Sequence, residues 1–86
     1  MVPLMSRLEE VKTLLDKTLG LGGRSAQFTA DTPLPGNLPE LDSMAVANLL
    51  VVFEEYFGCR IYEDEVDGET FATLGSLAAF IERKLG

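Results

Sequence analysis

Residues 41–58 read LDSMAVANLLVVFEEYFG, and they predict a long helix around which the rest of the chain can pack. Either Asp42 or Ser43 can cap the start of the helix, since both side chains carry an oxygen that accepts a hydrogen bond from a free backbone N–H group. We expect the helix to run to about Phe57 and to end at Gly58, a residue that readily adopts the left-handed conformation of a C-terminal cap.

The predicted helix is apolar on two sides. One continuous stripe at helical spacing is expected to face the core, and it consists of Val46, Leu50, Phe53 and Phe57. The opposite side carries a second apolar strip formed by Met44, Ala47 and Val51. The main polar neighbours of that strip are Asn48, Glu54 and Glu55. A helix that is apolar all round is either covered on both sides or leaves one side as a docking surface.

Two further helices are predicted, one before this helix and one after it. The first is expected over residues 6–19, where Ser6 and Glu9 form a capping box and apolar residues recur every three or four positions. The last is expected after Thr73, which caps it. Its expected core-facing side chains are Leu74, Leu77, Ala78 and Ile81, with Phe80 and Leu85 at the flanks.

The connections between these helices differ in composition. Residues 20–42 hold four glycines and three prolines, which break any helical period, while three leucines are spaced to hold this long loop against a core. Residues 63–69 form an acidic stretch with room for a short helical turn. No strand pattern is present. The prediction is an all-α fold over a single domain, residues 1–86: a small four-helix bundle of three main helices plus a short one, with a long loop between the first two.

Composition excludes several classes of function. The chain of 86 residues has seven basic and fourteen acidic residues, one cysteine and no histidine. Without histidine there is no Ser-His-Asp or Cys-His nucleophile and no zinc site with a histidine ligand, so we expect neither catalytic residues nor a metal. The acidic balance argues against nucleic acid as a partner. No apolar run approaches the roughly 18 residues of a membrane span, and we expect a cytoplasmic monomer that does not insert into a membrane.

Two loop motifs resemble ligand sites but fail their templates. Residues 20–25, GLGGRS, lack the Lys-Ser/Thr pair of a phosphate-binding loop and follow a helix instead of a strand, so they are interpreted as a helix end and a linker. Placing Gly68 at the sixth position of a calcium loop puts Leu74 at the twelfth, where a carboxylate is required. The acidic stretch is therefore interpreted as a solvated turn.

Ser43 is the candidate functional residue. Its ordinary interpretation is a serine in the cap or first turn of a helix. Its context favours more, because it starts an unusually apolar helix at the end of a long loop, inside residues 25–59, which hold five acidic and no basic side chains. A helix N-terminus offers free N–H groups and partial positive charge, so a phosphodiester on this serine would be well placed.

The same residues resemble the acyl carrier protein family. The resemblance lies in residues 41–44, LDSM, in the two leucines six and seven positions after Ser43, and in the FEEYFG ending of the helix. It continues through Ile61 and residues 71–77, FATLGSL. It implies a four-helix bundle in which Ser43 receives 4′-phosphopantetheine from coenzyme A through a separate Mg²⁺-dependent transferase.

The resemblance also implies roles for other residues. The protein would be a carrier and not an enzyme, with its cargo held as a thioester on the prosthetic group. Asp42 would assist recognition or metal binding during loading. The docking face of the helix would consist of Met44, Ala47, Val51, Glu54 and Glu55. Partners would be a phosphopantetheinyl transferase and an acyl/AMP ligase or acyltransferase. An apolar core would shelter an acyl chain, lined by Val46, Leu50, Phe53 and Ile61.

Two positions depart from the fatty-acid carriers of this family. Those carriers usually place acidic residues two and five positions after the modified serine, where this chain has Ala45 and Asn48. The departure favours a specialised lipid, polyketide or exopolysaccharide-related pathway, and residues 39–80 resemble stand-alone carriers of exosortase and exopolysaccharide loci. A D-alanyl or peptidyl carrier is the alternative, although peptidyl carriers typically have glycine in place of Leu41. A helical interaction module that is never modified is the alternative from another class.

Overall fold

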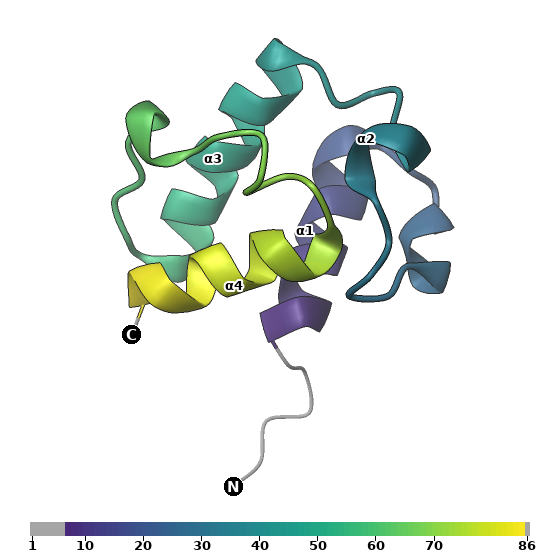
Figure 1. Cartoon of the computed structure of the whole chain (residues 1–86), viewed down its shortest axis with the longest axis horizontal. Helices are drawn as coiled ribbons and strands as arrows, with labels where there is room; N and C mark the ends of the chain where they lie inside the picture. The colour runs from purple at the N-terminus through teal and green to yellow at the C-terminus, as the bar shows by residue number, and fades with distance from the viewer. Residues whose placement is uncertain (1–6, 86) are drawn as a thin grey trace, which may run out of the picture.

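The structure is a computed structural model that describes residues 7–85. It contains four α-helices and two short 3-10 turns, and no strand occurs within those residues (Figure 1). The elements in chain order are α1 (Arg7–Leu19), η1 (Arg24–Gln27), α2 (Leu34–Asn37), α3 (Ser43–Phe57), η2 (Glu63–Glu65) and α4 (Leu74–Leu85). The prediction of an all-α fold with three main helices and a short one is confirmed.

The position of the short helix differs from the sequence-based expectation. We expected a helical turn in the acidic stretch, and that stretch does contain η2, a 3-10 turn. The short α-helix is α2, which lies inside the long loop at residues that include Pro35 and Gly36. Its four residues are too few for a periodic pattern, and it is stabilised from outside, because Leu34 donates its N–H to Ala72 O at 3.1 Å.

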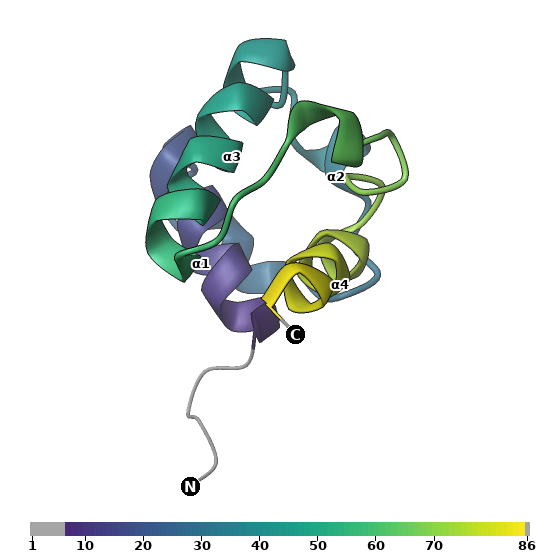
Figure 2. The same ribbon diagram turned by 90° about the vertical axis from the view of Figure 1, so that its left-hand side faces the viewer.

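Helix α1 packs against both α3 and α4 (Figures 1 and 2). Figure 2 shows α3 beside α1, and Figure 1 shows α4 crossing the lower part of α1. The three helices and their connections enclose one hydrophobic core, and its fully buried large side chains are Val11, Leu15, Leu34, Leu38, Leu49, Phe53, Leu74, Leu77 and Ile81. Since two of these leucines come from the long loop, the loop is part of the core and does not merely cover it.

Three apolar residues lie differently from the predicted stripes. Leu49 is fully buried although the core stripe of the predicted helix omitted it, and Phe80 is buried instead of lying at a flank. Phe57, placed in that stripe, is only half-buried. For Leu49 and Phe57 the reason is that α3 is apolar on nearly every side, so its sequence alone does not select which side faces α1.

Backbone hydrogen bonds join the long loop to the start of α4. Leu74 donates to Thr32 O at 3.0 Å, and Gly75 donates to Ala30 O at 2.8 Å. An isolated antiparallel bridge pairs Pro33 with Thr73. Thr73 also caps α4 as predicted, because its Oγ1 accepts the Ser76 N–H at 3.0 Å. The middle of the loop is thereby fixed relative to α4.

The beginning of the loop is held by Asp16 of α1. Its carboxylate accepts the Ser25 hydroxyl at 2.8 Å and the Gly23 N–H at 3.0 Å. These bonds, the Ser25 hydroxyl foremost, lower the pKa of Asp16. The glycine motif therefore serves as a structural turn, in agreement with its interpretation as a helix end and linker.

Arg7 connects three helices at the end of the bundle away from the loop. Its guanidinium forms ion pairs with Glu10 at 2.7 Å and with Glu82 of α4 at 2.8 Å, and it lies 5.1 Å from the centroid of the Phe57 ring of α3. The capping box predicted from Ser6 lies outside the described residues. Of the helices within residues 7–85, none combines the length and the hydropathy that a membrane crossing requires.

Candidate functional site

Asp42, and not Ser43, caps helix α3. Asp42 has an extended backbone with φ −112° and ψ −175°, and its Oδ1 accepts the N–H of Ala45 at 2.8 Å. Its carbonyl oxygen accepts the N–H of Val46 at 2.9 Å. Ser43 is the first residue of the helix and is exposed. Since Asp42 supplies the cap, the Ser43 hydroxyl is not needed to start α3.

The loop reaches Ser43 through a well-defined turn. Leu41 donates its N–H to Leu38 O at 3.0 Å, and Asp42 donates to Glu40 O at 3.0 Å. The Glu40 carboxylate forms an ion pair with Arg24 of η1. Because Leu38 is fully buried, this turn is anchored to the core two residues before the ion pair. The serine is therefore presented from a fixed backbone position.

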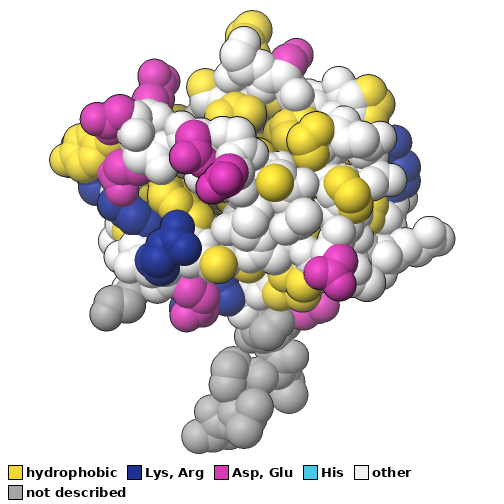
Figure 3. All heavy atoms as spheres, in the orientation of Figure 1, with side chains coloured by type: hydrophobic (Ala, Val, Ile, Leu, Met, Phe, Trp, Pro, Cys, Tyr) yellow, Lys and Arg dark blue, Asp and Glu magenta, His cyan; other side chains and the backbone are white. Residues whose placement is uncertain are grey.

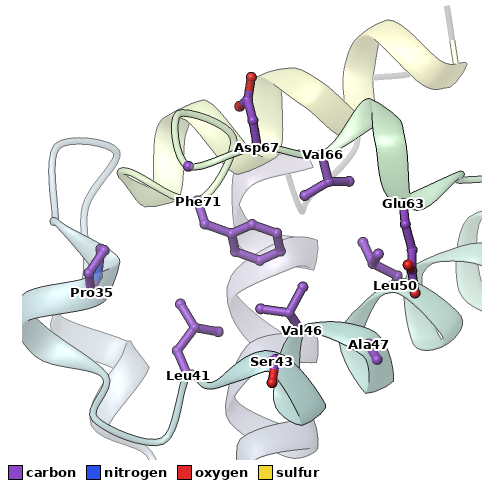
Figure 4. A pocket seen from close by; sticks show the side chains of 11 residues that line it. Pro35, Leu41, Ser43, Val46, Ala47, Leu50, Glu63, Val66, Asp67 and Phe71 are labelled. Atoms are coloured by element: carbon purple, nitrogen blue, oxygen red, sulfur yellow. The ribbon is translucent and has the colours of Figure 1, made fainter.

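A cleft of about 490 Å³ begins beside Ser43 (Figure 4). Most of its lining is apolar, and the lining residues are Pro35, Leu41, Ser43, Val46, Ala47, Leu50, Glu63, Val66, Asp67, Gly68 and Phe71. Figure 4 shows the side chains of Leu41, Val46, Val66 and Phe71 pointing toward one another, whereas the Ser43 hydroxyl turns away from them. No lysine or arginine lines the cleft. Since its charged lining residues are Glu63 and Asp67, the cleft suits an apolar guest without negative charge, next to an exposed hydroxyl.

The cleft corrects the expected shelter for an acyl chain. Of the four residues expected to line it, Val46 and Leu50 do, but Phe53 is 0% exposed and Ile61 only 6% exposed within the core. The opposite side of the cleft is supplied by Val66 and Phe71, from the segment after α3. Phe71 belongs to the FATLGSL segment that carried the family resemblance, and Val66 is an apolar residue between acidic ones; these were the signals available in the sequence.

The apolar strip of α3 predicted as a docking face reaches the surface. Met44 is 75% exposed and Val51 is 51% exposed, and Ala47 and Glu55 are exposed with them. Glu54 differs from the others, because it is half-buried and its Oε2 accepts the N–H of Ile61 at 2.7 Å. Glu54 therefore attaches the chain after α3 to the helix, and the exposed acid of this face is Glu55.

Two carboxylates of the acidic stretch after α3 are bonded to other residues of the chain. Glu65 binds Lys84 of α4, and this hydrogen bond is the foremost cause of its lowered pKa. Asp67 accepts the N–H and the hydroxyl of Thr70, which lower its pKa as well. Among residues 7–85, no three carboxylates or cysteines converge on a point where a metal ion would fit.

Comparison with known proteins adds three findings. Residues 9–81 match a family model described as a phosphopantetheine attachment site. The chain is 32% identical to the acyl carrier protein of Thermotoga maritima over 77 residues, which is 90% of this chain and 89% of that one. It is 51% identical to a holo acyl carrier protein from Nitrosomonas europaea whose solution NMR structure superposes with a TM-score of 0.86, covering 94% of this chain and 98% of that chain.

The likeness extends over nearly the whole chain and includes both sequence and fold. Members of the matched family carry 4′-phosphopantetheine as a prosthetic group. The region matched by the family model includes Ser43, the cleft and the exposed strip of α3. The chain therefore belongs to the acyl carrier protein family.

Proposed function

We propose that Ser43 is the attachment point of 4′-phosphopantetheine and that the chain, residues 1–86, acts as one carrier domain for an acyl group. The observation that carries the proposal is the position of the Ser43 hydroxyl. It is exposed, it is not needed for the helix cap, and it lies at the edge of an apolar cleft. A hydroxyl in this place is open to a transferring enzyme, while the cleft lies beside it.

The residues around Ser43 fit a phosphodiester. Asp42 accepts the N–H of Ala45, and its carbonyl oxygen accepts that of Val46, whereas the N–H groups of Ser43 and Met44 take part in neither bond. These two groups, together with the positive end of the α3 dipole, are available to stabilise a phosphate on the serine. Asp42 is exposed next to the serine and is proposed to assist its recognition during loading.

The cleft is proposed to shelter the cargo. The thiol at the end of the prosthetic group carries an acyl group as a thioester. The apolar side chains of Leu41, Val46, Val66 and Phe71 would cover such a chain, at a gain of about 0.8 kcal/mol for each buried CH₂ group. The apolar side chains favour an acyl cargo, and the aminoacyl cargo of a D-alanyl or peptidyl carrier remains the alternative, because Glu63 and Asp67 also line the cleft and could pair with an ammonium group.

Partner enzymes are proposed to dock on the exposed strip of α3. The strip lies directly after Ser43 and consists of Met44, Ala47 and Val51, with Glu55 beside it and Glu54 behind it. Those partners are a phosphopantetheinyl transferase and an acyl/AMP ligase or acyltransferase, and the carrier itself is not an enzyme. Ala45 and Asn48 make helix α3 less acidic than in fatty-acid carriers, which supports a specialised lipid, polyketide or exopolysaccharide-related pathway. We propose that the carrier is a monomer in the cytoplasm. The chain has one cysteine, Cys59, which cannot form an internal disulfide and fits a reducing compartment.

The test of the proposal is a transfer assay read by intact mass. The protein is incubated with coenzyme A, Mg²⁺ and a phosphopantetheinyl transferase of broad specificity, beside the variant Ser43→Ala. We expect the wild type to gain the mass of one phosphopantetheinyl group and the variant to gain nothing. A wild-type mass that stays unchanged with several transferases contradicts the proposal, and equal modification of the variant moves the site to another residue.

The second candidate is an interaction module that is never modified. The exposure of Met44 and Val51 favours it, because a partner helix can bind such a strip without any prosthetic group. In that case Ser43→Ala leaves the biological activity intact while Val51→Asp abolishes it. Under the carrier proposal, the single substitution Ser43→Ala is sufficient to abolish activity in cells.

A further inference from the structure

Residues 62–66, here called the η2 strap, form one wall of the cleft. Glu63 and Val66 of the strap line the cleft, opposite the α3 residues Val46 and Leu50. None of the residues of the η2 turn itself is buried, and only Val66 at its end packs against the core. Segments with so few buried contacts open at low free energy, so individual contacts decide how firmly the strap is held.

The strap is joined to α4 by a bond between Lys84 and Glu65. The Nζ atom of Lys84 lies 2.5 Å from Oε1 of Glu65, and the two side chains are only 23% and 29% exposed. The other oxygen of the same carboxylate, Oε2, accepts the N–H of Tyr62 at 3.0 Å at the start of the turn. One carboxylate thus attaches the strap to α4 and closes the turn within it.

The other end of the strap is fixed to α3. Glu54 accepts the N–H of Ile61, the residue immediately before the strap, at 2.7 Å. Ile61 is itself buried. The strap therefore has a firm anchor at one end, and its attachment farther along depends on Glu65 and on the packing of Val66.

Of the basic residues near the end of α4, Lys84 is the one that forms an ion pair with the strap. Figure 3 shows acidic side chains gathered over the region of η2, with lysine and arginine side chains beside them near the C-terminal end of α4. Two basic residues stand there, Arg83 and Lys84. Lys84 is half-buried and bonded to Glu65, whereas Arg83 is exposed and forms no bond with the strap. Arg83 has the same formal charge at nearly the same place, so it separates the effect of the bond from that of charge alone.

We propose that Lys84 is a positioning residue for the cleft, which fixes Glu65 and thereby holds the η2 strap at the distance from α3 that sets the width of the cleft. When the bond to Lys84 opens, the Glu65 carboxylate is free to leave Tyr62 as well, and the wall carrying Glu63 and Val66 moves outward. The inference rests on the proposed function only in taking an acyl chain as the natural guest of the cleft.

The experiment uses the full chain without a prosthetic group, in the wild type and in Lys84→Met, Lys84→Arg and Arg83→Met. Hydrogen exchange is followed at the amides of Glu65 and Val66, which bond to Tyr62 O and Glu63 O within the strap. In Lys84→Met we expect these amides to exchange about two- to five-fold faster, the range for losing a partly exposed ion pair. We expect the uncharged fluorophore Nile red to enter the cleft faster by a similar factor.

The control variants decide between positioning and a general loss of stability. Lys84→Arg should restore wild-type exchange, and Arg83→Met should leave it unchanged. The proposal is overturned if Glu65 and Val66 exchange at the wild-type rate in Lys84→Met, if Arg83→Met accelerates them equally, or if α1 and α3 accelerate to the same extent. Wild-type entry of Nile red in Lys84→Met also overturns it. Because no prosthetic group is involved, a failure of Ser43 to be modified leaves this result unaffected.

Discussion

The N–H of Gly75 donates to the carbonyl oxygen of Ala30 at 2.8 Å, and a Cβ atom placed on Gly75 would lie at the same 2.8 Å from that oxygen. The long loop and the start of α4 therefore approach so closely that a side chain at this position has no room. The loop crosses the start of α4 here, between η1 and α2.

Gly75→Ala is expected to destabilise the fold even though alanine is the better helix former. The change gains about 1 kcal/mol in helix propensity but forces the Ala30 carbonyl away, with an overpacking cost of about 1–3 kcal/mol and the loss of the hydrogen bond. We expect a net loss of about 1–2 kcal/mol in urea unfolding. Gly36→Ala in α2 is the matched control, since nothing lies within 4 Å of the new Cβ atom. Equal stability of the two variants would contradict the close contact.

Asp42 and Ser43 are neighbours with different expected roles, which substitution to alanine separates. Asp42→Ala removes the bond to the Ala45 N–H and should lower the free energy of unfolding by about 1 kcal/mol. Ser43→Ala removes no cap and should stay within about 0.5 kcal/mol of the wild type. Both are measured by urea unfolding monitored by circular dichroism. A large loss of stability in Ser43→Ala would mean that the serine is structural, and its failure to be modified would then be uninformative.

The stability of the fold is expected to fall only in acid. The pKa values of Asp16, Glu65 and Asp67 are lowered in the fold by hydrogen bonds, from ordinary values of 3.8 for the aspartates and 4.5 for the glutamate. A lowered pKa means that the unfolded chain binds protons first, so this contribution is complete above about pH 5 and is lost as the pH falls through the folded values. Because the chain has no histidine, we expect little change between pH 6 and pH 8.

Asp16→Asn isolates one part of that acid response. The variant should be less stable than the wild type at pH 7, because the charged acceptor of the Ser25 and Gly23 bonds is lost. The difference should narrow as the pH falls below the ordinary aspartate value of 3.8, because the wild-type chain then takes up a proton at Asp16 on unfolding, and it should disappear once the folded carboxylate is protonated as well. Thermal unfolding at a series of pH values measures both effects. A difference that stays constant down to pH 2 would show that the Asp16 charge does not matter.

The sequence predicted the elements with strong local signals. The bounds of α3 agree with prediction because a cap, an apolar period and a terminal glycine coincide there; at Gly58 φ is +69°, which favours glycine. The end of α1 at Leu19 also agrees with prediction. Helix α2 was not predicted, since a proline and a glycine in four residues give no helical signal and the helix depends on its bond to Ala72. Local patterns also do not show which distant segments meet.

The candidate site, too, was predicted where it depends on local sequence and missed where it depends on contacts between distant segments. Ser43 and the exposed strip of α3 followed from one continuous stretch of sequence, and the structure places both where that stretch implied. The cleft did not, because Val66 and Phe71 approach Val46 only through the packing of the segment after α3. The structural task of Glu54 was missed for the same reason, since its partner is the backbone N–H of Ile61, and a backbone group leaves no mark in the sequence.

Val51→Asp is expected to weaken the binding of partner enzymes without lowering the stability of the fold. Val51 is half exposed on the strip of α3, so the new carboxylate remains solvated and costs little stability. An apolar partner surface would have to desolvate that charge, and a loss of about 1.4 kcal/mol corresponds to a tenfold rise in the KM of the transferase for the carrier. Ala79→Asp places the same charge on the exposed side of α4 and should change KM by less than about twofold. If both variants raise KM equally, net charge and not the apolar strip governs docking; if Val51→Asp lowers KM, the partner surface is basic instead.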